Sequence, residues 1–190
     1  MSVYIEIMSF MVYSIGKGSL AVRTLPYMSL FRKYVKGAIF MAIQYRKLTA
    51  KDLDIFIAMR IRQLREEGAT EELDLKPNLL DYYRRHMADG TFVSWLAFDG
   101  EKIVGTSGMS FVEKPPYFSC PSGKIGLLSS MFTSDEYRRQ GIAKTLLTYV
   151  VEEARKYGCG CVQITASDMG VLLYTDFGFV KNGNFMQYKF

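Results

Sequence analysis

The chain has 190 residues, 49% of them hydrophobic, which suits one domain with a sizeable core. Its formal net charge of +5 suggests a nucleic-acid partner, but the charge is unevenly placed. Residues 1–40 carry five basic side chains and one acidic side chain, whereas the remaining 150 residues carry 19 basic and 18 acidic side chains. This nearly neutral main part argues against a basic face that binds nucleic acid.

The cysteines and the histidine show no spacing typical of a metal site. Cys159 and Cys161 flank Gly160 and would share one face of a strand, so we interpret them as reduced thiols in or near the core. With Cys120 they make an odd number, which favours a reducing, cytoplasmic setting. No apolar run approaches the roughly 20 residues needed to cross a bilayer. We therefore expect no metal and no membrane partner.

Residues 1–40 differ from the rest of the chain. The uncharged stretch at 7–16 has the length of a signal-peptide core, but it is preceded by Glu6 and by no basic residue, which argues against a secretion signal. A basic interfacial helix over 26–36 is an alternative. Lys36-Gly37-Ala38 can be encoded by a ribosome-binding sequence just before the codon for Met41. We expect translation to start at Met41, so that residues 1–40 are disordered or not native and 41–190 form the domain; an intact mass that includes 1–40 would contradict this.

The first part of the domain predicts alternating elements with clear boundary signals. Thr49 is a suitable helix N-cap, Pro77 suits the first turn of a helix, and Asp99-Gly100 is a strong hairpin signal. The expected order is a strand at 43–48, a helix at 49–67, a helix at 77–87, strands at 92–98 and 102–112, and a proline-containing loop at 114–123.

A strand at 124–133 then turns through polar residues 134–140 directly into a helix that opens at Gly141 and ends at Gly158. The first N–H groups of such a helix have no partner inside the helix, and the helix dipole adds positive charge there. Gly141 and Ala143 let an anion approach the main chain, with Arg138 and Arg139 beside it. The pattern indicates a phosphate site.

The helix after Gly141 is amphipathic, since its apolar residues recur at helical spacing. The remaining elements are expected to be a strand at 161–166, a short helix at 168–177 and a terminal hairpin that turns near 182–184.

Two segments carry a family resemblance. Arg138-Arg139-Gln140-Gly141-Ile142-Ala143 fits the pattern Arg/Gln-x-x-Gly-x-Gly/Ala, and Leu173-Tyr174 with Gly178-Phe179 lies about thirty residues further on. Both resemble, in order and spacing, the acyl-coenzyme A motif and the Leu-Tyr-x-x-x-Gly-Phe region of the GNAT superfamily of N-acetyltransferases. The similarity covers roughly residues 43–190.

The resemblance implies an α/β (α+β) GNAT fold: a mixed, mostly antiparallel central sheet of six to seven strands flanked by helices. In that fold the fourth and fifth strands splay apart, and the pantetheine arm of acetyl-coenzyme A (acetyl-CoA) inserts between them. Pairing of that arm with a strand edge needs only main-chain groups. The resemblance thus implies these cofactor-binding residues: Met131, Phe132, Thr133, Arg138, Arg139, Gln140, Gly141, Ile142, Ala143, Lys144 and Ser167.

For chemistry, the resemblance places Tyr174 beside the sulfur as a general acid; packing in a short helix is the alternative. Residues 124–133 contain no Asp, Glu or His, so the strand that carries a base in some family members offers none. Glu113 is a weak candidate for the base, with an ordinary solvated strand end as its alternative. Proton removal through water held by Ser129 or Ser130 is a further option.

The acceptor is the least defined part. A cluster of acidic residues at 66–74 borders the acceptor side in this fold, which suggests a cationic amine, although a solvated helix end explains the same charges. We expect transfer of acetyl from acetyl-CoA to a primary amine, more readily of a small molecule than of a protein; whether the chain forms a homodimer stays open. The alternatives are a longer acyl group, or a coenzyme A sensor without turnover.

Overall fold

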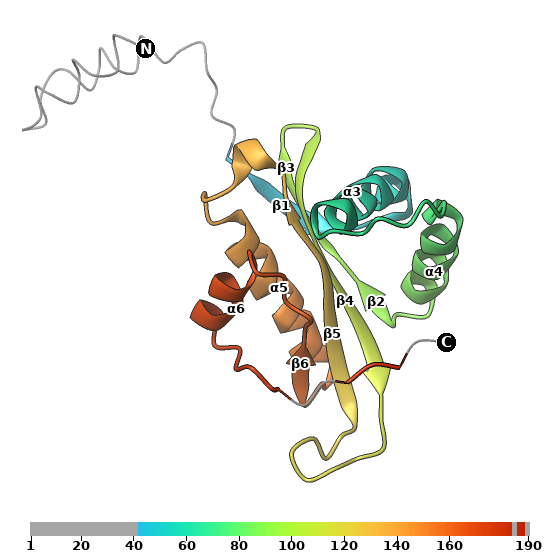
Figure 1. Cartoon of the computed structure of the whole chain (residues 1–190), viewed down its shortest axis with the longest axis vertical. Helices are drawn as coiled ribbons and strands as arrows, with labels where there is room; N and C mark the ends of the chain where they lie inside the picture. Colours follow the sequence, from blue (N-terminus) through green and yellow to red (C-terminus); the bar gives the residue numbers. More distant parts are fainter. Residues whose placement is uncertain (1–41, 184–185, 189–190) are drawn as a thin grey trace, which may run out of the picture. The chain divides into compact units, whose positions relative to one another are not determined.

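The structure is a computed structural model, and it describes residues 42–183 and 186–188 (Figure 1). The expectations for residues 1–40 and for a start at Met41 fall outside the described residues. Asn184 of the predicted terminal hairpin is also outside them, and the described residues around it are assigned to no strand.

The domain is built on one six-stranded sheet in the order β1-β3-β4-β5-β6, with β2 paired to β4 beside β3. Every pair is antiparallel except β5 with β6, which is parallel. The prediction of a mixed, mostly antiparallel sheet is confirmed. The strands are β1 (Gln44–Lys47), β2 (Phe92–Val93), β3 (Trp95–Asp99), β4 (Lys102–Glu113), β5 (Lys124–Thr133) and β6 (Cys161–Gln163).

Helices cover both faces of the sheet (Figure 1). α3 (Leu53–Glu66), preceded by the 3₁₀ turn η1 (Ala50–Asp52), and α4 (Lys76–Ala88) lie on one face. α5 (Ile142–Tyr157), preceded by η2 (Asp135–Tyr137), and α6 (Val171–Phe177) lie on the other. Each face has its own apolar core, one around Phe56, Tyr83 and Leu96 and one around Met109, Leu147 and Val150.

The predicted strand at 92–98 is interrupted at Ser94 for a local reason. The Ser107 hydroxyl accepts a hydrogen bond from Trp95 N–H at 3.2 Å and donates one to Trp95 C=O at 3.0 Å. This side chain therefore takes the place of ladder bonds between the strands. The hairpin turn also lies one residue later than predicted, since Asp99 pairs with Lys102 and Gly100, with φ +59°, begins the turn.

Strand β5 matches its predicted bounds, but a bulge interrupts it. Thr106 pairs with Phe132 and Gly108 with Ser129, so β5 carries two residues where β4 carries Ser107 alone. Within the bulge Ser130 has φ +52°, and its C=O accepts a hydrogen bond from Thr106 Oγ1 at 2.8 Å. Such a bulge bends the strand that carries it.

The neighbouring strand β6 pairs with β5 over Ile125–Leu127 and ends at Gln163, before the predicted Ala166. α6 likewise begins at Val171 rather than Asp168, because 168–170 form a turn. The two strands thus separate beyond Leu127.

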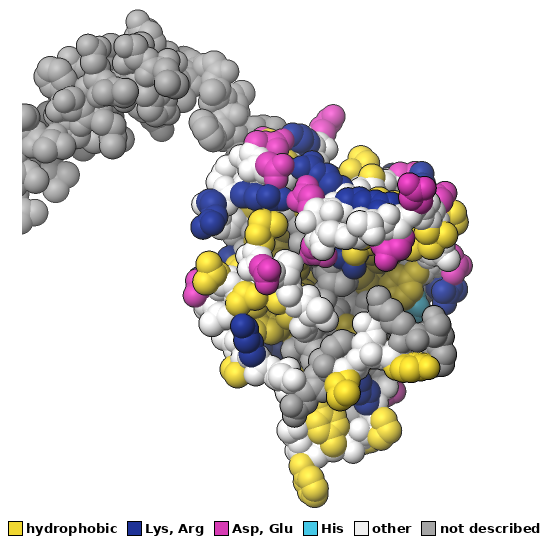
Figure 2. All heavy atoms as spheres, in the orientation of Figure 1, with side chains coloured by type: hydrophobic (Ala, Val, Ile, Leu, Met, Phe, Trp, Pro, Cys, Tyr) yellow, Lys and Arg dark blue, Asp and Glu magenta, His cyan; other side chains and the backbone are white. Residues whose placement is uncertain are grey.

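The two ends of the sheet differ in surface chemistry. Acidic and basic side chains lie interspersed in the upper part of the view, whereas hydrophobic side chains gather at the lower end (Figure 2). That lower end is the loop between β4 and β5, where Phe118 is fully exposed.

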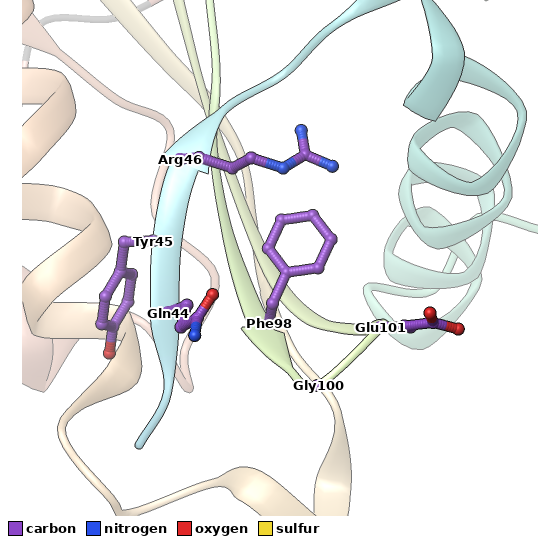
Figure 3. A pocket seen from close by; sticks show the side chains of 6 residues that line it. All are labelled: Gln44, Tyr45, Arg46, Phe98, Gly100 and Glu101. Atoms are coloured by element: carbon purple, nitrogen blue, oxygen red, sulfur yellow. The ribbon is translucent and has the colours of Figure 1, made fainter. Parts of the chain in front are cut away.

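A small hollow of about 340 Å³ lies beside the edge strand β1 (Figure 3). The guanidinium of Arg46 lies 4.3 Å from the centre of the Phe98 ring and donates two hydrogen bonds of 2.8 Å to Asp52. Asp52 also accepts a hydrogen bond from Thr49 N–H at 2.9 Å, which confirms Thr49 as the start of the helical segment. Of the two charged residues on this hollow, Arg46 and Glu101, Arg46 is therefore already engaged in holding β1 to the start of α3.

We expect Asp52→Asn to lower the free energy of unfolding by about 1–3 kcal/mol at neutral pH. The hydrogen bonds from Arg46 hold the pKa of Asp52 well below its usual range, outweighing the effect of burial. A lowered native pKa gives stability that is present above about pH 4 and is lost as the pH falls further. Urea unfolding at several pH values measures the free energy of unfolding of both proteins and how it falls at low pH. Asp54→Asn, at a carboxylate with a 79%-exposed side chain, should cost less than about 0.5 kcal/mol.

Candidate functional site

A cavity of about 740 Å³ lies where β5 and β6 separate. Its walls come from the C-terminal part of α3, the second half of β5, the start of α5, the segment after β6, and α6. It brings together all but one of the predicted cofactor-binding residues, namely Met131, Phe132, Thr133, Arg138, Arg139, Gly141, Ile142, Ala143, Lys144 and Ser167, and it also includes Tyr174. Their binding and catalytic roles stay predictions.

Two predicted residues are not brought to this cavity. Gln140 points its amide at the C=O of Glu136, to which it donates a hydrogen bond of 3.1 Å. Glu113 pairs with Lys124 at the far end of β5 from Thr133. Nine residues of strand separate these ends, or about 30 Å, too far for direct proton transfer.

The turn into α5 shapes its backbone for an anion. Arg139 and Gly141 both have positive φ, +64° and +81°, and Gly141 is the N-cap of α5 without a side-chain cap. Consecutive N–H groups in such alternating conformations converge on one point. A Cβ on Gly141 would meet no atom of the described residues within 4 Å, so they leave the space in front of the helix open. The predicted phosphate site therefore has suitable backbone geometry and room.

The edge of β5 offers further polar groups. Beyond Leu127 the strand loses its parallel neighbour, so its edge from Leu128 to Thr133 borders the cavity. Among the described residues, Thr133 Oγ1 is buried and has no hydrogen-bond partner. A buried hydroxyl without a partner is costly. This site therefore suits an extended ligand that carries amide groups, which could pair with the hydroxyl.

Four charged residues form a closed ring of ion pairs beside the cavity, and two of them, Glu66 and Arg138, line it. Glu66 pairs with Arg62 at 2.8 Å and with Arg138 at 2.7 Å, and Asp135 pairs with the same two arginines at 2.9 and 2.8 Å. Arg138 Nε also donates to Thr133 C=O at 3.0 Å. Both guanidinium groups lie near the Phe132 ring, at 5.2 and 6.0 Å from its centre. The ring of four ion pairs fastens the end of α3 to the loop before α5.

The end of α3 supplies Arg60 and Gln63, which the sequence did not predict for the site, beside Glu67 of the predicted acidic cluster. Arg60 Nη1 donates to Gln63 Oε1 at 3.0 Å, and Gln63 Nε2 donates to Glu67 Oε1 at 2.9 Å. These three side chains are spaced i, i+3 and i+7, so they share one helix face, which was the only sequence signal for Arg60 and Gln63. Of the predicted acidic cluster, Glu66 and Glu67 line the cavity, whereas the residues from Glu71 to Asp74 do not.

Tyr174 lies on α6 and is 7% exposed. Burial, with a smaller contribution from the charge of Glu67, raises the pKa of Tyr174 to about 12. The phenol therefore stays protonated at neutral pH. The ring packs closely on Gly170, where a Cβ would come within 2.7 Å of Tyr174 Cε2.

Other expectations concern the whole described part of the chain. Within it no group of three or more His, Cys, Asp or Glu side chains could hold a metal ion. None of its helices is both long enough and apolar enough to cross a bilayer. His86 contacts Thr91 Oγ1 at 2.6 Å, in keeping with a structural role.

Comparisons with known proteins agree on one family. The profile described as "Acetyltransferase (GNAT) family" matches residues 57–179, which is more than half of the chain. N-acetyltransferase 8B of Rattus norvegicus is 35% identical over 115 residues, 58% of this chain and 50% of the relative. N-acetyltransferase 8 of the same organism is 34% identical over 113 residues, which are 57% of this chain and 49% of the relative. The chain thus spans about half the length of the curated relatives it matches.

A solved structure is similar over most of the domain. A predicted acetyltransferase from Clostridium acetobutylicum, crystallised with acetyl-CoA, is 28% identical with a TM-score of 0.75, and the match covers 78% of this chain and 96% of that one.

We expect Gly170→Ala to displace the Tyr174 ring, because the new methyl group would overlap it. Overpacking of this kind costs about 1–3 kcal/mol of unfolding free energy, measurable in urea. Gly183→Ala is the matched control, since a Cβ there meets no atom within 4 Å among residues 42–183 and 186–188. Equal stability of the two variants would contradict the prediction.

Proposed function

Because the chain belongs to the acetyltransferase (GNAT) family, we propose that residues 41–190 form an N-acetyltransferase domain. It transfers the acetyl group of acetyl-CoA to a primary amine by direct attack. The observation that carries the proposal is the single cavity in which the open N-terminus of α5, the free edge of β5 and Tyr174 meet.

The residues of the cavity fit coenzyme A in chemistry. Its diphosphate would lie at the N–H groups from Gly141 to Lys144, and its pantetheine amides along Met131–Thr133, where the Thr133 hydroxyl lacks a partner among the described residues. Arg139 and Lys144 form no ion pair within the described residues, so their charges are available to the diphosphate. Arg138 already holds Glu66 and Asp135, and we assign it first to the position of the loop.

The transfer requires a neutral amine whose nitrogen forms a bond to the acetyl carbon as the carbon–sulfur bond breaks. The departing thiolate then needs a proton, which Tyr174 would supply. A pKa of about 12 keeps this phenol protonated, but it lies several units above the usual value for a thiol, near 8.5. We therefore assign Tyr174 a hydrogen bond to the developing thiolate, with transfer completed where burial also raises the basicity of that sulfur.

Removal of the amine proton falls to water rather than to Glu113. Ser129 and Ser130 both line the cavity, but Ser130 Oγ lies 3.4 Å from the buried Tyr83 hydroxyl, with which it can form a hydrogen bond. Ser129 is therefore the better-placed hydroxyl to orient a water molecule.

All three cysteines are free thiols, which is in keeping with the proposed cytoplasmic setting.

Thermal shift with coenzyme A tests the binding step, because a ligand at a hundredfold excess over Kd stabilises the fold by about 2.7 kcal/mol. Thiol release from acetyl-CoA with a panel of small amines then tests turnover. Binding without thiol release would indicate a sensor, and faster release from longer acyl thioesters would indicate a different donor. Absence of any coenzyme A shift would overturn the proposal.

We expect Gly141→Glu to abolish the coenzyme A shift, since it places a carboxylate where the diphosphate binds. Gly158→Glu is a matched control at the other end of α5. Both glycines have left-handed φ, +81° and +86°, and open space at Cβ, so the conformational cost is alike. The control should keep its shift, and loss of binding in both variants would point to unfolding of the helix instead.

Tyr174→Phe should lower kcat by about 10²- to 10⁴-fold while the Kd of coenzyme A changes little. The phenyl ring keeps the packing against Gly170 and removes only the hydroxyl. Stopped-flow or colorimetric thiol release measures kcat, and calorimetry measures Kd. Tyr157→Phe, at the exposed end of α5, serves as a control that keeps full activity. An unchanged kcat for Tyr174→Phe would remove the acid role.

A further inference from the structure

The cavity is electrically divided. Three of its four basic residues, Arg138, Arg139 and Lys144, lie near the start of α5, and the fourth, Arg60, lies on α3 and donates a hydrogen bond to Gln63. Its acidic residues are Glu66 and Glu67 at the end of α3, and Asp176 on α6. Glu66 is held by two arginines. Within residues 42–183 and 186–188, neither Glu67 nor Asp176 has an ion-pair partner.

Glu67 is oriented by a neighbour rather than neutralised by one. Gln63 is 7% exposed. Its side-chain amide forms one hydrogen bond with Arg60 and another with Glu67. An arginine can only donate, so the amide oxygen must face Arg60 and the NH₂ group must face Glu67. Gln63 thus holds Oε1 of Glu67, and the second carboxylate oxygen remains available to a ligand on the cavity wall.

Glu67 is unsuited to hold the nitrogen that reacts. An amine of pKa near 10.4 is neutral in only about one molecule in a few thousand at pH 7. A carboxylate beside it stabilises the ammonium form, and every 1.4 kcal/mol of that effect lowers the neutral fraction about tenfold. The useful partner for Glu67 is a positive charge elsewhere on the same molecule.

We propose that Glu67 binds a second cationic group of the acceptor, so that the preferred acceptors are small primary amines that carry another positive charge. This inference rests on the proposed acetyl transfer. Glu67 acts as a specificity-determining residue, Gln63 as the residue that positions it, and the reacting nitrogen lies towards β5 and Tyr174.

The test uses three acceptors with the same five-carbon chain: cadaverine, pentylamine and δ-aminovalerate. They end in a cation, a methyl group and a carboxylate, respectively. The full chain and the variants Glu67→Gln, Glu67→Lys and Glu72→Gln are assayed for thiol release from acetyl-CoA. Glu72 is an exposed glutamate of the same segment that does not line the cavity, so its variant controls for net charge.

We expect the unaltered chain to prefer cadaverine to pentylamine in kcat/KM by about tenfold, or about 1.4 kcal/mol. Glu67→Gln should lose that preference chiefly through a higher KM for cadaverine. Glu67→Lys should prefer δ-aminovalerate, and Glu72→Gln should behave as the unaltered chain. A reversal in Glu67→Lys cannot come from misfolding, because a misfolded variant loses all three activities.

Two outcomes would overturn the inference separately from the proposed function. Equal kcat/KM for cadaverine and pentylamine, or a preference unchanged in Glu67→Gln, would refute the role of Glu67 while acetyl transfer stands. No thiol release with any of the three amines, despite a coenzyme A thermal shift, would refute the proposed transfer and this inference with it.

Discussion

The site depends on how strand β5 is paired. On one side it pairs with β4 from Lys124 to Thr133, and on the other it pairs with β6 over Ile125–Leu127. A strand edge without a neighbour must satisfy its polar groups with something else. The bulge at Ser130, where the Ser130 C=O accepts a hydrogen bond from the Thr106 hydroxyl, bends the strand three residues beyond Leu127, the last residue paired with β6. The cavity lies along this unpaired edge of β5, from Leu128 to Thr133.

A second constraint joins the two halves of this cavity. The ring of Arg62, Glu66, Arg138 and Asp135 ties the last turn of α3 to the loop that leads into α5. Exposed ion pairs contribute little singly, but a closed ring shares the entropic cost of fixing its side chains. Its main effect is positional, because it sets the glutamates of α3 opposite the backbone amides of α5. The same ring explains why Arg138, although it begins the anion motif, is engaged with protein groups.

Local patterns were sufficient where the relevant interactions are local. The bounds of β5, the glycines that open and close α5, and Pro77 in the first turn of α4 follow from backbone preferences within a few residues. The break at Ser94 was not predictable in this way, since it depends on the hydroxyl of Ser107 on the adjacent strand. Glu113 seemed near the reaction because it precedes β5 in sequence, yet antiparallel pairing carries it to the opposite end.

The sequence by itself determined the order of elements from β1 to α6, the family resemblance and the backbone of the predicted anion-binding turn, because each depends on residues close together along the chain. Tertiary structure alone decided that Arg60, Gln63 and Glu67 face the same cavity as Tyr174, and that the acidic residues further along do not. The physical reason is that α3 and α6 lie more than a hundred residues apart in the chain and meet only as walls of one cavity. No local preference specifies such a contact; it forms only when the core places both helices against the same part of β5.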